Sequence, residues 1–376
     1  MQLKKHLFAC SAILLSVILP LMSCGEGNHI YTCTLNEISG VVDFHTEAQK
    51  KYISGNYDAI ECKGDEELSR PQGLRLEWSL SDEKSSKGKA QEYLVELSRS
   101  EDFATALSFH TEESYVDVYN LYLGATYYWR VSAKFANGGE CLSTSSSFKT
   151  AEGTPRNLYI DGVTNARDLG GWEIEGGRKV KQGMLYRTAR LNRSYAKKPK
   201  NEISEKGKKT MLDELGVRSE IDLRNPNMEY PETGGLTSSV LGEDVNYYNV
   251  PMSFSDVGEY VSTPNEQIKE IFSILSKKNN YPVFFHCNIG TDRTGLIAFL
   301  VNGLLGVSEE DLYRDYLFSN FANIGGSRTV ENIREAYVDR IKAYQGESLS
   351  EKIRNCLLGC GVSADQLDDV VSIMSE

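Results

Sequence analysis

The chain has 376 residues, of which 40% are hydrophobic and 25% charged, and its formal net charge is −12. This balance is typical of globular proteins and excludes disordered, collagen-like and multi-pass membrane proteins. The negative charge argues against a nucleic-acid partner, because such binding depends on Lys and Arg that neutralise phosphates. Eight cysteines are too few for a disulfide scaffold of this length. At roughly 150 residues per domain, we expect two or three domains.

The chain begins with the pattern of an export signal, over residues 1–23. Two lysines precede an apolar run from Leu7 to Met22 that is short for a membrane span. The run ends in LMSC at residues 21–24, which resembles the lipobox of bacterial lipoproteins. That resemblance implies that Cys24 becomes the lipidated first residue, and it places the protein in the bacterial cell envelope, anchored by acyl chains. The alternative is an ordinary cleaved signal peptide, which also exports the protein.

The next two segments carry no catalytic pattern. Residues 24–64 lack strong periodicity and are predicted to be a spacer behind the lipid anchor. Between 65 and 150, apolar and polar residues alternate in short runs, as in LRLEW at 74–78 and YLVEL at 93–97. Such runs, separated by turn residues, predict an antiparallel β-sandwich. The segment LYLGATYYWRVSAKF at 121–135 resembles the signature of a fibronectin type III module, which implies a spacer or a site for a protein partner.

After Thr154-Pro155 the pattern changes to strands alternating with helices, which predicts an α/β domain over residues 155–376 with a helix-covered sheet. The predicted strands are Ser219–Leu223, Asn246–Val250 and Val283–His286. The predicted helices are Ile203–Leu215, Asn265–Lys277, Gly295–Leu305, Ser308–Phe318, Thr329–Tyr344 and Leu349–Leu358. The expected fold class is therefore multidomain, with a β-sandwich followed by an α/β domain.

One loop of this domain combines a cysteine, a glycine and an arginine. The sequence HCNIGTDRTG at 286–295 follows an aromatic strand and leads into an apolar helix. A tight turn from a strand into a helix points successive backbone N–H groups and the helix N-terminus at one place, which creates an anion site. The same positive field stabilises a thiolate, the nucleophilic form of Cys287. Arg293 adds a planar fork suited to two phosphate oxygens.

This loop resembles the signature of the bacterial branch of the cysteine-dependent protein tyrosine phosphatases. Three further segments are similar to motifs of that branch in the expected order: GVTNARDLGGW at 162–172, GMLYRTARL at 183–191 and LGVRSEIDLRNPNMEYPE at 215–232. The resemblance implies a tyrosine phosphatase-like α/β domain. It also implies a phosphocysteine intermediate and no metal or other cofactor.

The resemblance also implies roles for individual residues. Cys287 is the expected nucleophile, and Arg293 is expected to bind the transferred phosphate. The backbone amides expected to hold the phosphate oxygens are those of Asn288, Ile289, Gly290, Thr291, Asp292 and Arg293. Thr294 is expected to donate to the cysteine sulfur, and His286 to order the loop from behind. Arg187 lies inside a matched motif and is expected to approach the site.

The general acid is open, because no tryptophan of the chain is followed by Pro-Asp, the motif that many tyrosine phosphatases use. A proton must still reach the leaving oxygen. Asp292, inside the loop, is the first candidate, and Asp222 and Asp256 are the alternatives. Asp222 has the second interpretation of a structural residue in the wall of the site.

The substrate is also open. Many members of the branch have Lys where this chain has Thr291, and that lysine is linked to phosphoinositide substrates. Its absence favours phosphotyrosine or another aryl phosphate. We therefore expect an exported tyrosine or dual-specificity phosphatase with a phosphorylated substrate, with a phosphoinositide or inositol phosphate phosphatase as the alternative. A binding protein that reads phosphate without turnover is a minor alternative.

Most of a basic segment and five cysteines lie outside the motifs above. A basic segment from Arg178 to Lys209 contains only Glu202 and Glu205 as acidic residues, and it either steers anionic substrates or forms a solvated face. Among the cysteines, Cys10 leaves with the signal. The others without a predicted role are odd in number, so they cannot all pair within one chain. They are Cys33, Cys62, Cys141, Cys356 and Cys360, with Cys33 and Cys62 as the candidate bridge.

Overall fold

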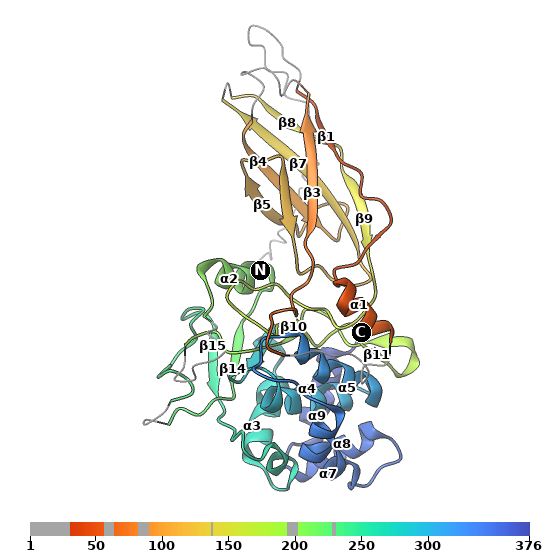
Figure 1. Ribbon diagram of the computed structural model, residues 1–376, viewed down its shortest axis with the longest axis vertical. Helices are drawn as coiled ribbons and strands as arrows, with labels where there is room; N and C mark the ends of the chain where they lie inside the picture. Colours follow the sequence, from red (N-terminus) through yellow and green to blue (C-terminus); the bar gives the residue numbers. More distant parts are fainter. Residues whose placement is uncertain (1–30, 56–63, 82–89, 137, 194–201, 228–230) are drawn as a thin grey trace, which may run out of the picture.

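The computed structural model describes residues 31–55, 64–81, 90–136, 138–193, 202–227 and 231–376 (Figure 1). The predicted signal with Cys10 and Cys24, the cysteine Cys62 and part of the basic segment lie outside these ranges. Within the described residues, no helix has both the length and the apolar character needed to cross a membrane. The ribbon shows a β-rich part above a part that contains most of the helices (Figure 1).

The first part consists of two sheets around one apolar core. One sheet has the order β1–β3–β6, with strands Cys33–Leu35, Leu74–Leu80 and Tyr115–Val118. The other has the order β2–β9–β7–β4–β5 with β8 beside β7, and its strands are Val41–Val42, Ser146–Thr150, Thr126–Phe135, Ala90–Ser98, Leu107–Thr111 and Glu140–Leu142. Trp78, Trp129 and Val131 lie in the core between the sheets. The arrangement agrees with the alternating sequence pattern, and the fibronectin type III resemblance stays a prediction.

Part of the predicted spacer is folded. β1 and β2 add strands to the two sheets, and the helix α1 (Glu47–Ser54) packs against the second part of the chain through Tyr52. Thr46 caps α1 by accepting a hydrogen bond from the Gln49 backbone N–H at 3.3 Å. The sandwich therefore extends beyond the boundary predicted at residue 65. Strands of two and three residues are too short to show alternation in the sequence.

A five-stranded sheet forms the centre of the second part. Its order is β10–β13–β16–β14–β15, with strands Arg167–Asp168, Leu185–Thr188, Val283–His286, Ser219–Asp222 and Asn246–Asn249. The last four strands of this order run parallel, and β10 is antiparallel to β13. The three predicted strands are confirmed. β10 was missed because two residues are too few to show a pattern, and β13 was indicated only by the resemblance of residues 183–191 to a family motif.

The helices of this part are α2 (Glu205–Lys209), α3 (Glu266–Leu275), α4 (Asp292–Leu304), α5 (Glu309–Phe318), α6 (Val330–Ile333), α7 (Asp339–Lys342), α8 (Leu349–Gly359) and α9 (Ala364–Met374). The helices predicted at 203–215 and 329–344 are each interrupted by a π-helical turn, at Thr210–Glu214 and Arg334–Val338. The helix α9 was not predicted. A small hairpin of β11 (Glu173–Ile174) and β12 (Arg178–Lys179) lies apart from the main sheet.

Helices cover both faces of the sheet, as predicted. Side chains of successive strand residues point to opposite faces, and β16 separates two cores in this way. Val283 and Phe285 belong to the core that contains α3, α4 and α5, whereas Phe284 belongs to a core with Tyr186 and Met211. The apolar run near Leu296 is the central part of α4, where the residues from Arg293 to Leu304 are all buried. This run is therefore a core helix.

A buried polar interface joins the two parts. Arg156 donates to the Asn120 carbonyl at 2.5 Å and to the Leu121 carbonyl at 3.1 Å, and it pairs with Asp168 at 2.6 Å. The Asn120 side chain exchanges two hydrogen bonds with the backbone of Tyr159, at 2.7 and 3.0 Å. Because these groups are buried, separating the two parts would leave charged and polar atoms without partners. The sandwich is thus fixed against the second part.

Candidate active site

The predicted cysteine loop lies at the carboxyl ends of parallel strands. β16 ends at His286, and the loop Cys287–Thr291 leads into α4. The neighbouring strands end beside it, because Thr188 of β13 and Asp222 of β14 are both in register with His286. Cys287 is 2% exposed. This edge of a parallel sheet is where α/β proteins bind ligands.

Each carbonyl of the loop has a hydrogen-bond donor behind it. The contacts are Cys287 O with His286 Nδ1 at 3.1 Å, Asn288 O with the Arg190 N–H at 3.1 Å, Ile289 O with Asn165 Nδ2 at 2.9 Å, and Gly290 O and Thr291 O with Arg187 Nη2 at 2.7 and 3.4 Å. Carbonyl and N–H groups of one peptide unit point in opposite directions. The contacts behind the loop therefore turn its N–H groups to the front.

The front of the loop is an anion site. In the described part of the chain, the N–H groups from Ile289 to Arg293 donate to no acceptor outside the helix. They lie at the N-terminus of α4, whose dipole adds positive potential. Gly290 has a φ of +72°, and a Cβ there would clash with the Thr188 carbonyl oxygen. Only glycine allows the loop to turn this closely over β13.

A second layer of buried charges holds the donors in place. Asp315 of α5 accepts from Arg187 at 2.6 Å and from Arg167 at 2.8 Å, and Arg167 donates to the Asn165 side chain at 2.5 Å. Burial alone raises the pKa of Asp315, but the two arginines outweigh it and hold the pKa below its ordinary value. Burial, with the nearby Arg187, lowers the pKa of Arg167 to about 10. Arg187 therefore supports the loop from behind and does not line the pocket.

Arg293 is clamped on one edge by a carboxylate. Glu232 accepts from Nη1 at 2.8 Å and from Nη2 at 3.2 Å, and it also accepts from the Asn288 side chain at 2.7 Å. Nη1 donates further to the Leu223 and Met252 carbonyls. These contacts use Nη1 and one N–H of Nη2. The edge formed by Nε and Nη2 is left for a second pair of oxygens, and this is the bidentate geometry that a phosphate needs.

We expect Glu232→Gln to lower kcat/KM on an aryl phosphate by about 10- to 100-fold, with little change in melting temperature. A neutral amide cannot accept hydrogen bonds with both of its terminal atoms, so the guanidinium loses part of a charge-assisted pair. Steady-state kinetics and thermal unfolding measure the two effects. The control is Glu243→Gln, an exposed glutamate in the loop before β15. Unchanged kinetics in the Glu232 variant would contradict the assignment.

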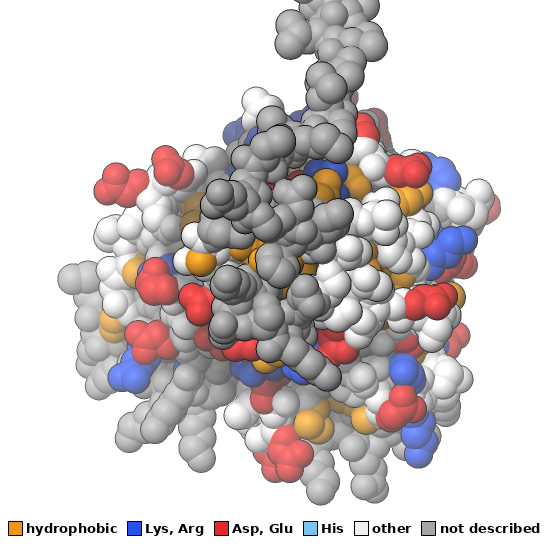
Figure 2. Space-filling model, turned by 90° about the horizontal axis from the view of Figure 1, so that it is seen from above, with side chains coloured by type: hydrophobic (Ala, Val, Ile, Leu, Met, Phe, Trp, Pro, Cys, Tyr) orange, Lys and Arg blue, Asp and Glu red, His pale blue; other side chains and the backbone are white. Residues whose placement is uncertain are grey.

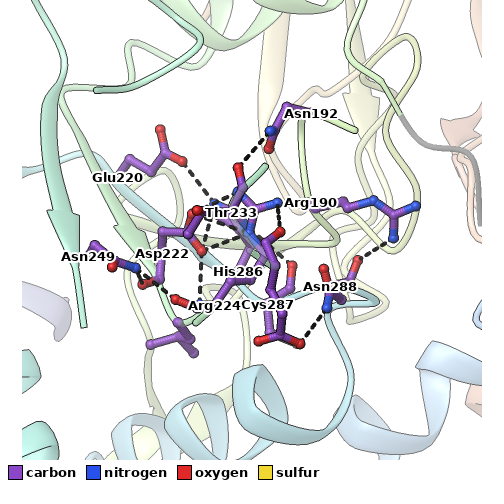
Figure 3. A network of polar contacts seen from close by, with 12 residues as sticks. Arg190, Asn192, Glu220, Asp222, Arg224, Thr233, Asn249, His286, Cys287 and Asn288 are labelled. Carbon is purple, nitrogen blue, oxygen red and sulfur yellow. Dashed lines mark hydrogen bonds and ion pairs between the residues drawn. The ribbon is translucent and has the colours of Figure 1, made fainter. Parts of the chain in front are cut away.

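His286 is enclosed by acidic groups (Figure 3). Its Nε2 lies 2.9 Å from Glu220 Oε1 and 3.9 Å from Asp222 Oδ1, and all three side chains are buried. These three residues are also the described cluster that offers metal-ligand atoms. However, Asp222 already forms a bidentate ion pair with Arg224 and accepts from the Tyr247 hydroxyl at 3.0 Å. The arrangement fits an ion-pair network behind the loop better than a metal site.

The structure sets one of the three candidates for the general acid, Asp222, apart from the other two. Asp222 is fully buried and paired with Arg224, and His286 and Arg224 outweigh burial to hold its pKa below the ordinary value. It therefore fits the structural interpretation. Asp292 and Asp256 both line a cavity of 390 Å³. Asp292 accepts from Arg328 Nε and Nη2 at 2.9 Å each, so it must exchange that ion pair for a proton before it can act as an acid.

The sequence was compared with models of known protein families. A model of the tyrosine phosphatase family matches residues 158–372. The chain belongs to the tyrosine phosphatase family. The match covers every residue of the site described above.

Individual relatives are more distant. A protein of Cupriavidus necator named as a tyrosine-protein phosphatase is 29% identical over 196 residues, which are 46% of this chain and 66% of the relative. A tyrosine-protein phosphatase of Nostoc commune is 31% identical over 123 residues, which are 29% of this chain and 42% of the relative. The chain thus spans less than two thirds of the length of each. The core catalytic domain of the PP-IP phosphatase SIW14 from S. cerevisiae shows 21% identity over 41% of this chain and 81% of its own, with a TM-score of 0.27.

Several residues of this phosphatase site were not singled out in the sequence. Asn165, Arg167 and Glu232 lie inside the matched motifs, which was the only signal for them, and Asp315 had none. The Thr294 hydroxyl is buried and has no hydrogen-bond partner among the described residues, so the structure does not contain the predicted O–H···S bond from Thr294 to Cys287.

The basic segment has a surface part as well as the buried Arg187 and Arg190, which contact the loop. Acidic and basic side chains are interspersed on the face shown in Figure 2. In the described part of the basic segment, lysines pair with acids on the surface, as Lys179 does with Glu152 and Lys208 with Glu205. This fits the solvated face. Cys33 belongs to the sandwich core, where the side chain packed against it is Cys141; its candidate partner Cys62 lies outside the described residues.

Proposed function

We propose that the protein is a phosphomonoesterase of the tyrosine or dual-specificity type, which works through a phosphocysteine intermediate. The observation that supports this is the loop in which N–H groups and one open edge of Arg293 converge in front of Cys287. These groups are placed to bind the three non-bridging oxygens of a phosphate and to stabilise the charge that they carry in the transition state. Arg293 does not act alone, because Glu232 holds its orientation.

The proposed reaction has two steps. The Cys287 thiolate attacks phosphorus, the bond from phosphorus to the ester oxygen breaks, and that oxygen takes a proton from Asp292 or Asp256. Water then attacks the phosphocysteine, and the same carboxylate removes a proton from it. The sulfur–phosphorus bond breaks, which releases inorganic phosphate and restores the thiolate. No metal or other cofactor enters this scheme.

We infer that the substrate is an aryl phosphate, with phosphotyrosine as the first candidate. Phe254 is 71% exposed and borders both the 390 Å³ cavity that contains Asp292 and a 450 Å³ cavity that contains Glu232. An exposed aromatic ring at this place can pack against the ring of a substrate. Thr291 supports the same choice, because its side chain is buried against Asn165 and adds no cation to the pocket.

The test is hydrolysis of a panel of phosphate esters by the chain without its predicted signal, in the presence of a reductant that protects the thiol. The panel compares tyrosine- and serine-phosphorylated peptides, phosphoinositides and inositol phosphates. We expect the highest kcat/KM on phosphotyrosine peptides. Equal or better turnover of the phosphoinositides or inositol phosphates would favour the alternative substrate class. Tight phosphate binding without turnover of any ester would favour a binding protein.

We also propose that the protein is exported and anchored to the bacterial cell envelope through lipid on Cys24. The support is the sequence of residues 1–24, with its lysines, apolar run and LMSC end. The sandwich, rigidly joined to the phosphatase part, would then be presented at the membrane as a site for a protein partner. A second chain bound there would lie outside the catalytic pocket.

We expect Cys24→Ala to abolish incorporation of labelled palmitate and to move the protein from the membrane fraction to the soluble fraction of the envelope. One cysteine supplies the only thiol in the lipobox-like sequence, and stable anchoring needs the acyl chains that it would carry. Metabolic labelling and fractionation measure the two effects. Cys10→Ala serves as the control, because Cys10 lies inside the cleaved segment. Label on the Cys24 variant would disprove the anchor.

A further inference from the structure

A strap from the N-terminal region, defined here as residues 64–70, lies against the phosphatase part. Its backbone pairs with the turn after α5: the Gly64 N–H donates to the Asn320 carbonyl at 3.0 Å, and the Ile324 N–H donates to the Gly64 carbonyl at 2.9 Å. The Leu68 N–H donates to the Phe321 carbonyl at 2.6 Å. Gly64 has a φ of +65°, and a Cβ there would clash with the Gly326 carbonyl. The strap is therefore packed closely on this turn.

Glu67 is the central side chain of the strap. One carboxylate oxygen accepts from the Thr164 hydroxyl and from the Asn323 N–H, and the other accepts from the Ser69 hydroxyl and N–H. Ser69 in turn accepts from the Asn165 N–H at 3.3 Å. Burial raises the pKa of Glu67. The carboxylate thus joins two segments of the phosphatase part that are far apart in the sequence.

Both segments hold the catalytic loop. The first contains Asn165, whose side chain donates to the Ile289 carbonyl at 2.9 Å and to the Thr291 hydroxyl at 3.2 Å. The second contains Asn320, which exchanges hydrogen bonds of 2.7 and 2.8 Å with the backbone of Arg328. Arg328 is the partner of Asp292. The strap therefore contacts Asn165 directly through Ser69 and reaches Arg328, the partner of Asp292, through Asn320.

We propose that the strap is part of the catalytic apparatus and that Glu67 is a positioning residue for the loop Cys287–Asp292. This inference rests on the proposed phosphatase function and adds to it, because the family match begins only at residue 158. The residues before the phosphatase domain would thus be required for full turnover, and the sandwich would be coupled to the site through the strap that precedes β3. Residues 155–376 alone would form a phosphatase with a poorly ordered loop.

The experiment compares Glu67→Gln with Glu66→Gln, a matched change at the exposed neighbouring residue. Steady-state kinetics on an aryl phosphate separate kcat from KM, and thermal unfolding reports stability. We expect Glu67→Gln to lower kcat by about 5- to 20-fold with KM changed less than twofold, and Glu66→Gln to match the wild type. A merely structural contact would lower the melting temperature and leave kcat of the folded protein unchanged, and that result would overturn the proposal.

A second variant removes the same hydrogen bond by changing its donor, Thr164. Thr164→Val removes the hydroxyl that donates to Glu67, and it should lower kcat to a similar extent. Because both changes break one interaction, the double variant should be no slower than the worse single variant. Additive losses would overturn the proposal even if Glu67→Gln folds poorly. A wild-type chain inactive on every phosphate ester would refute the phosphatase function itself, whereas an active wild type with unchanged variants refutes only the role of the strap.

Discussion

Replacing Cys287 with serine is expected to lower hydrolysis of aryl phosphates by roughly 10³-fold or more. A serine hydroxyl is a much weaker nucleophile than the sulfur of a cysteine, so the proposed attack on phosphorus should fail in the variant. The N–H groups and Arg293 are untouched by this change. Phosphate should therefore bind to the variant about as well as to the wild type, although no ester bond is broken.

Two measurements separate these effects. Steady-state kinetics give the loss of turnover, and calorimetric titration with inorganic phosphate gives the retained binding. The matched control is Cys141→Ser, the same chemical change in a half-buried residue of the sandwich, which should leave activity intact. Residual turnover within tenfold of the wild type would show that Cys287 is not the nucleophile.

Replacing Arg187 with leucine should cost both stability and activity. The Arg187 side chain is fully buried and donates one hydrogen bond to Asp315 and one to the Gly290 carbonyl. The leucine variant loses both hydrogen bonds. Breaking a buried pair by removing one partner costs about 3–5 kcal/mol. Without this donor, some loop carbonyls would turn to the front, and the N–H groups would no longer point at the phosphate. We therefore expect kcat to fall by about 100-fold or more.

Chemical denaturation and kinetics on the folded fraction measure the two losses, and pH gives a further check. The pKa of Asp315 lies below its ordinary value, so the folded state favours the ionised form. The ion pair therefore adds stability above the ordinary aspartate pKa of about 3.9, and this stability is lost as the pH falls through the lower folded value. The difference in unfolding free energy between the wild type and the Arg187 variant should therefore shrink in acid. A constant difference in unfolding free energy down to pH 2 would contradict this assignment.

The catalytic loop was predictable because its determinants are adjacent in the chain. A strand, Cys287, Gly290, Arg293 and an apolar helix follow one another within one short stretch, and that order alone produces an anion site. Most helices were predictable for the same reason, since their periodicity is local. The strand β10 was not, because two residues cannot show a pattern, and the only signal for β13 was the resemblance of residues 183–191 to a family motif.

The contacts behind the loop could not be predicted from the sequence, because they form only in the tertiary structure. Arg187 meets Asp315, and Glu232 meets Arg293, across separations of 128 and 61 residues. Both carboxylates stand in ordinary amphipathic or loop sequence, where nothing distinguishes a buried ion-pair partner from a solvated one. Which charge is buried, and against which partner, is decided only when strands and helices pack. Asp222 was set apart from the other two candidate acids in the same way, by its burial and its ion pair with Arg224.

The sequence by itself predicted the cysteine loop and the order of the two folded parts, and it determined the acidic overall charge that argues against nucleic acid. Each of these depends on composition or on neighbours in the chain. Only the tertiary structure decided how the loop is held, from Asn165 and Arg187 behind it to Glu67 in the strap. The contacts of Asn165 and Arg187 join distant segments of one predicted domain, whereas those of Glu67 join two predicted domains. Glu67 lies at the start of the segment predicted as a β-sandwich, and it can reach the loop only after folding brings it there.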